Sequence, residues 1–188
     1  KNLGLIRAEV LISYFDLLRL NLIATEGIEL ALKNQQLSQI ESKLIALQEH
    51  HMQLQTLEQR ETVAQALSDF SLQNKNIISQ SQEVLVLLAI GNLQMIYDKA
   101  LVLKEDIDRS LTDQGKMELA TIGRASDETN RSLHAAKLKL DDFWASTLQR
   151  SQSNYYLANF YGDLPRTLNP IYVNLSQSLA YLSELLGI

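Results

Sequence analysis

The sequence predicts an all-α protein, an elongated antiparallel up-and-down bundle of four or five helices with a long first helix. Three observations carry this prediction. Only two Pro and seven Gly occur among 188 residues, so helix breakers are few. Apolar residues recur at alternating spacings of three and four, as in helices that pack lengthwise. No stretch shows the sustained alternation of β-branched residues that is typical of strands.

The length fits a single elongated helical-bundle domain over residues 1–188. The alternative is two stacked helical modules that share the first helix.

The first predicted helix spans Leu3 to about Leu57. From residue 30 onward its apolar residues follow a heptad pattern with two seams. One seam is Leu30, Leu37 and Leu44, and the other is Ile40, Leu47 and Leu54. His51 continues the first seam, which predicts that it faces a neighbouring helix while His50 faces solvent.

The part of this helix before residue 30 is apolar on several sides, which predicts that it enters the bundle core. It should also accept the short last helix. One of its seams consists of Leu3, Ile6, Val10, Leu17 and Leu20.

A second seam runs from Val63 through Asn74 to Met95. Two interpretations fit it. A turn at residues 59–61 begins a second helix, or the first helix runs on and turns at residues 73–76. The unbroken seam across Asn74 favours the first interpretation, with the second helix continuing to about Leu111.

The next turn is predicted at residues 112–115, because Gly115 accepts a positive φ. A third helix should run from about residue 119 to about Phe160. The following segment, residues 161–170, contains both prolines and is expected to be irregular. A short last helix is predicted from about Ile171 to Leu186.

Composition excludes several functions. A net charge of −5 without a Lys/Arg cluster argues against binding to nucleic acid or anionic lipid. The absence of Cys excludes disulfides and thiolate metal sites, and it favours location in an oxidising compartment.

No run of about 18 uncharged apolar residues occurs, so no membrane span is expected within the chain. The first residue is Lys1, which predicts a processed or excised protein.

Nothing in the sequence predicts an enzyme. His50 and His51 are adjacent and would point about 100° apart on a helix, so they cannot share one metal ion. No Glu-x-x-His pair, nucleophile motif or glycine-rich phosphate loop is present. We therefore expect no catalytic residues, no metal and no cofactor.

Two groups of residues are candidates for ligand binding. Aromatic residues gather near the prolines, where together with a cation they form a candidate site for a small organic anion. These residues are Tyr155, Tyr156, Phe160, Tyr161 and Arg166. The alternative is that they only pack the helix end. Separately, polar residues at seam positions either set the helix register or line a small cavity. They are His51, Asn74, Ser81, Ser126 and Thr129.

The whole pattern resembles the helical extracytoplasmic sensor domains of bacterial transmembrane receptors, such as chemoreceptors and sensor histidine kinases. The shared features are the long first helix, the up-and-down connectivity, the missing Cys, the acidic Gln/Ser/Asn-rich surface and ends on one side. The resemblance implies a position on the periplasmic or extracellular side of a bacterial inner membrane, which flanking segments would span. It also implies that a small solute or a periplasmic binding protein is the ligand, and that helix displacement carries the signal.

The alternative function is that of a structural or interaction coiled-coil module, such as a scaffold, secretion or toxin component that oligomerises. In either case we expect a homodimer through the first helix. Its contact should use the part of the seam from Leu30 to Leu54 that a short last helix cannot cover.

Overall fold

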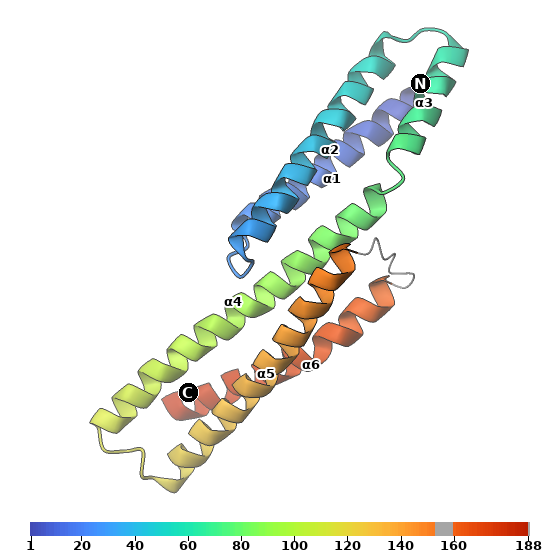
Figure 1. Ribbon diagram of the computed structural model, residues 1–188. Helices are drawn as coiled ribbons and strands as arrows, with labels where there is room; N and C mark the ends of the chain where they lie inside the picture. Colours follow the sequence, from blue (N-terminus) through green and yellow to red (C-terminus); the bar gives the residue numbers. More distant parts are fainter. Residues whose placement is uncertain (153–159, 188) are drawn as a thin grey trace. The chain divides into compact units, whose positions relative to one another are not determined.

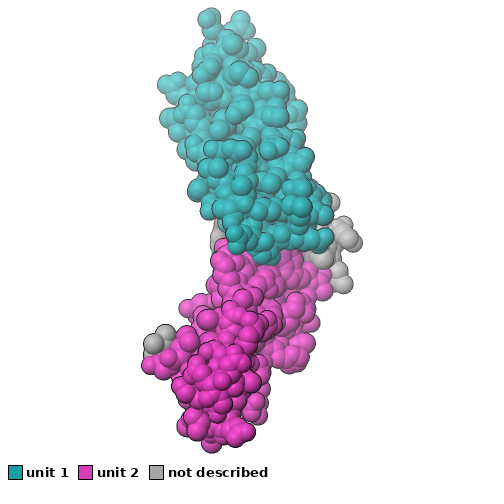
Figure 2. Space-filling model, turned by 90° about the vertical axis from the view of Figure 1, so that its left-hand side faces the viewer, with its two compact units in different colours: residues 1–88 teal, residues 89–188 magenta. Residues whose placement is uncertain are grey.

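The computed structural model describes residues 1–152 and 160–187, with side chains described for residues 1–147 and 162–187. These residues form six α-helices and no strand (Figure 1). The all-α prediction is confirmed, whereas the number of helices exceeds the four or five expected. The chain divides into two compact units, residues 1–88 and residues 89–188 (Figure 2).

The first unit is built around two antiparallel helices, α1 (Asn2–Ala24) and α2 (Leu30–Thr56), which pack along one another (Figure 1). The shorter α3 (Arg60–Gln73) packs on α2. A small apolar cluster joins the three helices and closes one end of the unit. Its members are Leu5, Leu54, Leu57, Val63, Ala66 and Leu67.

The prediction of one first helix from Leu3 to about Leu57 is wrong, because the chain reverses between α1 and α2. Thr25 ends α1 in an extended conformation, and its amide and hydroxyl both donate to the carbonyl of Asn21. Lys33 of α2 then donates to the carbonyls of Ile23 and Thr25, at 2.7 and 2.8 Å. A cation at the carboxyl end of a helix satisfies free carbonyls and the helix dipole.

Both turns considered for the second seam are present. The chain leaves the helix at Leu57–Gln59, and it turns again at residues 74–76 before α4 (Ile77–Asp113) begins. Residues 77–88 of α4 belong to the first unit and residues 89–113 to the second. α4 is therefore the helix that contributes to both units.

α4 ends as the sequence predicts. Gly115 has a φ of +64°, its amide donates to the carbonyl of Thr112, and the amide of Lys116 donates to that of Leu111. This pair of hydrogen bonds is a Schellman motif, in which glycine adopts the left-handed conformation at lowest cost.

The second unit contains the rest of α4 with α5 (Ala120–Gln152) and α6 (Phe160–Leu186), and α5 and α6 pack along one another (Figure 1). α5 carries a buried seam from Ser126 to Phe143, which confirms the predicted seam positions of Ser126 and Thr129. Its buried residues are Ser126, Thr129, Leu133, Ala136, Leu140 and Phe143. Lys104 of α4, which is 2% exposed, pairs with Asp108 and donates to Ser126 Oγ at 3.0 Å.

The predicted irregular segment at residues 161–170 is wrong, as is the short last helix, because α6 begins at Phe160 and includes Pro165 and Pro170. Each proline removes one amide donor and leaves one helix carbonyl without its partner. Both prolines are exposed, so water can reach these carbonyls. The buried face of α6, which includes Ile171, Leu175 and Leu182, holds the helix in place.

Two expectations for the first unit also need correction. The seam of α1 that was expected in the core is exposed, at Leu3, Ile6, Val10, Leu17 and Leu20. Most of the α2 seam that was expected to remain open to a partner is buried instead, at Ile40, Leu44, Leu47 and Leu54.

One helix among the described residues, α4, is long and apolar enough to cross a membrane as judged by length and composition. Several of its apolar residues, Val84, Leu87 and Ile90, are buried within the protein. In all, 39% of its most apolar 18-residue stretch is buried.

The burial pattern of α5 is tested by a matched pair of leucines, because Leu140 is fully buried and Leu138 is 53% exposed. Leu140→Ala should lower the free energy of unfolding by about 2–5 kcal/mol, since it leaves a cavity. Leu138→Ala should change it by less than about 0.5 kcal/mol. Urea unfolding followed by circular dichroism measures both, and equal losses would contradict the orientation of α5.

Candidate functional site

Three polar residues of α2 stand seven residues apart and face the chain from α3 to α4. Each has one partner there. Gln36 interacts with the carboxyl group of Glu83 of α4, Lys43 Nζ donates to Asn74 Oδ1 at 2.8 Å, and His50 stacks on Phe70 of α3. We call Gln36, Lys43 and His50 the polar ladder. A seven-residue spacing keeps all three on one side of α2.

The stacked pair fixes α3 against α2. The ring centroids of His50 and Phe70 lie 4.0 Å apart, with 14° between the planes. Asn74 follows one turn later, and its side-chain amide donates to the carbonyl of Phe70 at 3.0 Å. The Asn74 carbonyl accepts the amide of Ile77, the first residue of α4, at 3.1 Å. Asn74 thus connects α2, α3 and α4.

Burial shifts the pKa of a group in each step of this ladder. Burial lowers the pKa of His50, and the neighbouring charge of His51 lowers it further. Burial also lowers the pKa of Lys43 and raises the pKa of Glu83, where the hydrogen bond from Gln36 opposes the rise. In every case desolvation disfavours the charged form.

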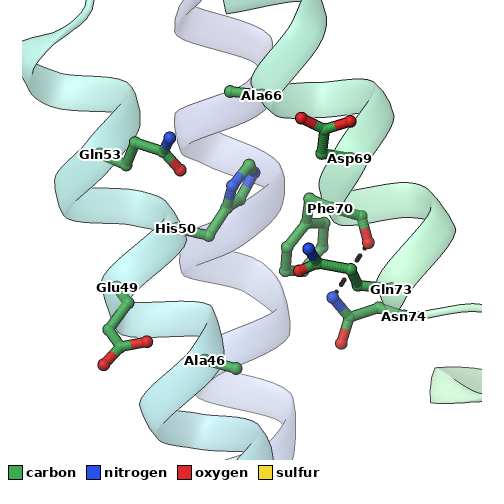
Figure 3. Close-up of a pocket in the computed structure, with 9 residues that line it drawn as sticks. All are labelled: Ala46, Glu49, His50, Gln53, Ala66, Asp69, Phe70, Gln73 and Asn74. Atoms are coloured by element: carbon green, nitrogen blue, oxygen red, sulfur yellow. Dashed lines mark hydrogen bonds between the residues drawn. The ribbon is translucent and has the colours of Figure 1, made fainter.

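A half-open cleft of about 250 Å³ lies between α2 and α3, beside the stacked pair (Figure 3). His50 projects from α2 toward the ring of Phe70, and the side chains around them are mostly polar (Figure 3). The lining residues are Ala46, Glu49, His50 and Gln53 of α2, Ala66, Asp69, Phe70 and Gln73 of α3, and Asn74.

The cleft has a carboxylate on each wall, Glu49 on α2 and Asp69 on α3, with no Lys or Arg in its lining. The side chains of Gln53, Gln73 and Asn74 add amide donors and acceptors. Burial disfavours the imidazolium of His50, so the two carboxylates are the charged groups of the lining itself, and the Lys43 ammonium lies behind the lining on Asn74 Oδ1. The cleft is therefore suited to a small polar solute that carries a positive charge.

The prediction that His51 faces a neighbouring helix is confirmed, whereas the prediction that His50 faces solvent is wrong. His50 is 7% exposed and faces α3, whereas His51 is only half-buried and its Nε2 lies 3.1 Å from a carboxylate oxygen of Glu9 on α1. The reason is that α2 has neighbours on two sides. One contacts the side that carries His51, and the other contacts the side that carries His50.

The predicted aromatic site is not formed by an irregular loop. Arg166 is exposed on the second turn of α6, and Phe160 and Tyr161 begin that helix. Tyr155 and Tyr156 lie outside the described residues, as do the side chains of Phe160 and Tyr161. The binding of a ligand by these residues stays a prediction.

Sequence reasoning identified one residue of the cleft, Asn74, as a polar residue at a seam position. It did not identify Glu49, Asp69 or His50. The available signal was the coincidence of Gln36, Lys43 and His50 at a spacing of seven, which marks a second contact face beside the leucine seam.

Among the described residues no group of three or more His, Asp or Glu side chains could hold a metal ion.

Comparison with known proteins adds no relative: no family model, no curated protein and no solved structure matches the chain.

The burial of His50 has a consequence for stability at acid pH. Its folded pKa lies below its unfolded value of about 6.5, so the unfolded state binds the proton first as the pH falls. The melting temperature of the wild type should therefore drop relative to that of His50→Leu as the pH is lowered from 7.5 to 5.5. The control His134→Leu, which changes an exposed histidine of α5, should keep the wild-type pH dependence. A pH dependence that survives in His50→Leu would contradict this assignment.

Proposed function

We propose that the chain is an extracytoplasmic ligand-sensing domain of a bacterial transmembrane receptor, and that the cleft between α2 and α3 binds a small solute bearing an amine. Flanking segments would connect the domain to the membrane. Occupation of the cleft would displace α3, and the displacement would pass into α4.

The observation that carries this proposal is the position of Asn74. It lines the cleft, and it hydrogen-bonds Lys43 of α2, Phe70 of α3 and Ile77 of α4. A solute that contacts Asn74, or that spreads α2 and α3, alters the bonds that hold the α3–α4 turn. Energetic coupling needs such an element, whose arrangement the ligand biases.

The chemistry of the cleft supports an amine-bearing ligand. The carboxylate of Asp69 can accept a charge-assisted hydrogen bond from an ammonium group, exposed Glu49 adds a second negative charge at the edge of the cleft, and the amides can bind further polar atoms. A volume of about 250 Å³ is slightly below the range of roughly 300–1,000 Å³ for drug-sized ligands. This size fits a solute such as an amino acid or a short diamine.

The continuity of α4 supports the relay. Its first turns follow directly from Asn74, and the same helix runs on into the second unit. An α-helix transmits an axial displacement with little loss, because every turn is hydrogen-bonded to the next.

The alternative function, an interaction module that acts by oligomerisation, is favoured by a different observation: the exposed apolar seam on α1. The two functions are compatible, since a sensor domain can also self-associate.

Ligand binding is tested by thermal-shift measurements with a panel of amino acids, diamines and quaternary ammonium compounds. A ligand at 100 times its dissociation constant should raise the melting temperature by about 5–10 °C. Glu49→Gln and Asp69→Asn should each abolish the rise. Glu41→Gln, an exposed site on α2 outside the cleft, should preserve it. The proposal fails if no compound stabilises the protein, or if the rise persists in both cleft variants.

The relay is tested separately with Lys43→Met, which removes the bond to Asn74 without altering the lining of the cleft. In the wild type, a ligand found by the screen should slow amide hydrogen exchange at residues 77–80. The Lys43→Met variant should still bind this ligand, as shown by its thermal shift, but should lose most of that protection. Equal protection in both proteins would show that the turn does not depend on the Lys43–Asn74 contact.

A further inference from the structure

α1 carries two seams on nearly opposite sides, and only one of them has a partner within the described residues. The inner seam faces α2 and contains Ala8, Phe15, Leu18 and Leu22, all of which are buried. The other, which we call the outer seam, is at least half exposed and consists of Leu3, Ile6, Val10, Leu17 and Leu20. At 100° per residue, the two seams lie about 150° apart.

The outer seam has the spacing of a coiled-coil contact. Its residues follow one another at intervals of three, four, seven and three, with exposed Ser13 at the seam position inside the longest interval. Five large apolar side chains in such a row are more than the scattered exposed leucines of an ordinary surface. The row extends over about 26 Å of helix.

We propose that the outer seam binds the same seam of a second copy of this chain, so that two α1 helices pair in parallel. The partner is a second copy because the seam is apolar and the charged residues beside it, Glu9 and Asp16, meet no like charge when two copies pair in parallel. The inference does not depend on the proposed ligand.

Charge selects the parallel orientation. The positions that flank the outer seam carry Glu9 and Asp16 on one side, and Arg7, Tyr14 and Asn21 on the other. In a parallel pair, Glu9 faces Tyr14 of the second copy and Asp16 faces its Asn21, so no like charges meet. In an antiparallel pair that places Leu3 opposite Leu20, Glu9 would face Asp16 of the second copy, and this contact would occur twice. Like charges at these positions disfavour that orientation.

The number of partners follows from the position of α2. Because α2 covers the inner seam, α1 has room for one more helix on its outer side, which gives a dimer.

The area predicts a modest affinity. Each exposed side chain of the seam offers roughly 100 Å² of apolar surface, which amounts to roughly 1,000 Å² for two copies. Specific interfaces begin at about this size. We therefore expect an equilibrium between monomer and dimer in the micromolar range rather than an obligate dimer.

Sedimentation equilibrium over a wide range of concentrations tests the association. The double variant Ile6→Glu, Leu17→Glu should raise the dimer dissociation constant by about 100-fold or more, because it places four carboxylates in the contact. The control is Ile45→Glu, Met52→Glu, since these residues of α2 are as exposed as Ile6 and Leu17 but lie outside the seam. This control should dimerise like the wild type. Circular dichroism checks that each variant keeps its helicity.

Disulfide cross-linking tests the orientation, and the absence of native Cys makes the result specific. In a parallel pair Ile6→Cys should cross-link to itself, and so should Leu17→Cys. In an antiparallel pair the cross-link would form only when the two variants are mixed, because residue 6 would then lie opposite residue 17 and far from residue 6 of the second copy.

Three results would overturn the proposal. One is a wild type that stays monomeric at the highest concentration. If Ile6→Glu, Leu17→Glu then also lowers the melting temperature, another part of the same chain covers the seam. The second is a dimer that the double variant does not weaken. The third is cross-linking that requires the mixture of the two Cys variants.

Discussion

The polar ladder of α2 is the constraint on which the first unit depends. Its three residues each meet one partner, and the partners lie in three successive parts of the chain: Phe70 in α3, Asn74 in the turn and Glu83 in α4. A shift of α3 and α4 along α2 would leave buried polar groups without partners. The free-energy cost of such unpaired groups exceeds the net stabilisation that their hydrogen bonds contribute when formed. The ladder therefore sets register more than it adds stability, as buried polar groups do at coiled-coil seams.

The same ladder explains why the candidate site lies between α2 and α3. Half-buried Lys43 and buried His50 prevent the tight apolar packing that leucines would give, so the helices are joined by a stacked pair and hydrogen bonds and leave a cleft beside them. α3 is held otherwise by the small apolar cluster around Leu54 at its far end. Because α3 makes few apolar contacts, a ligand can displace it at a lower free-energy cost than a helix with an extensive buried face.

The sequence could predict what depends on local spacing: the all-α class, the seam positions of Ser126 and Thr129 on α5, and the glycine at the end of α4. It could not predict the reversal between α1 and α2, because the bonds from Lys33 to Ile23 and Thr25 join two helices that must already lie side by side. Nor could it place the site. Whether His50 or His51 faces α3 depends on which side of α2 the third helix occupies, and a single amphipathic pattern leaves both sides open.

The two halves of the first unit thus carry different kinds of contact. The outer seam of α1 is apolar and tolerates small shifts, because hydrophobic burial has no direction. The ladder on α2 depends on hydrogen bonds, which do have direction and fail when groups move by fractions of an ångström. A second copy held on the outer seam would leave the ladder and the cleft accessible, since the two seams of α1 lie on nearly opposite sides and α2 carries the ladder. Association and ligand binding would then be independent unless a ligand also changes the packing of α1 on α2. The contact that would report such a change is the one between Glu9 and His51, which is the one side-chain to side-chain hydrogen bond between these helices among the described residues.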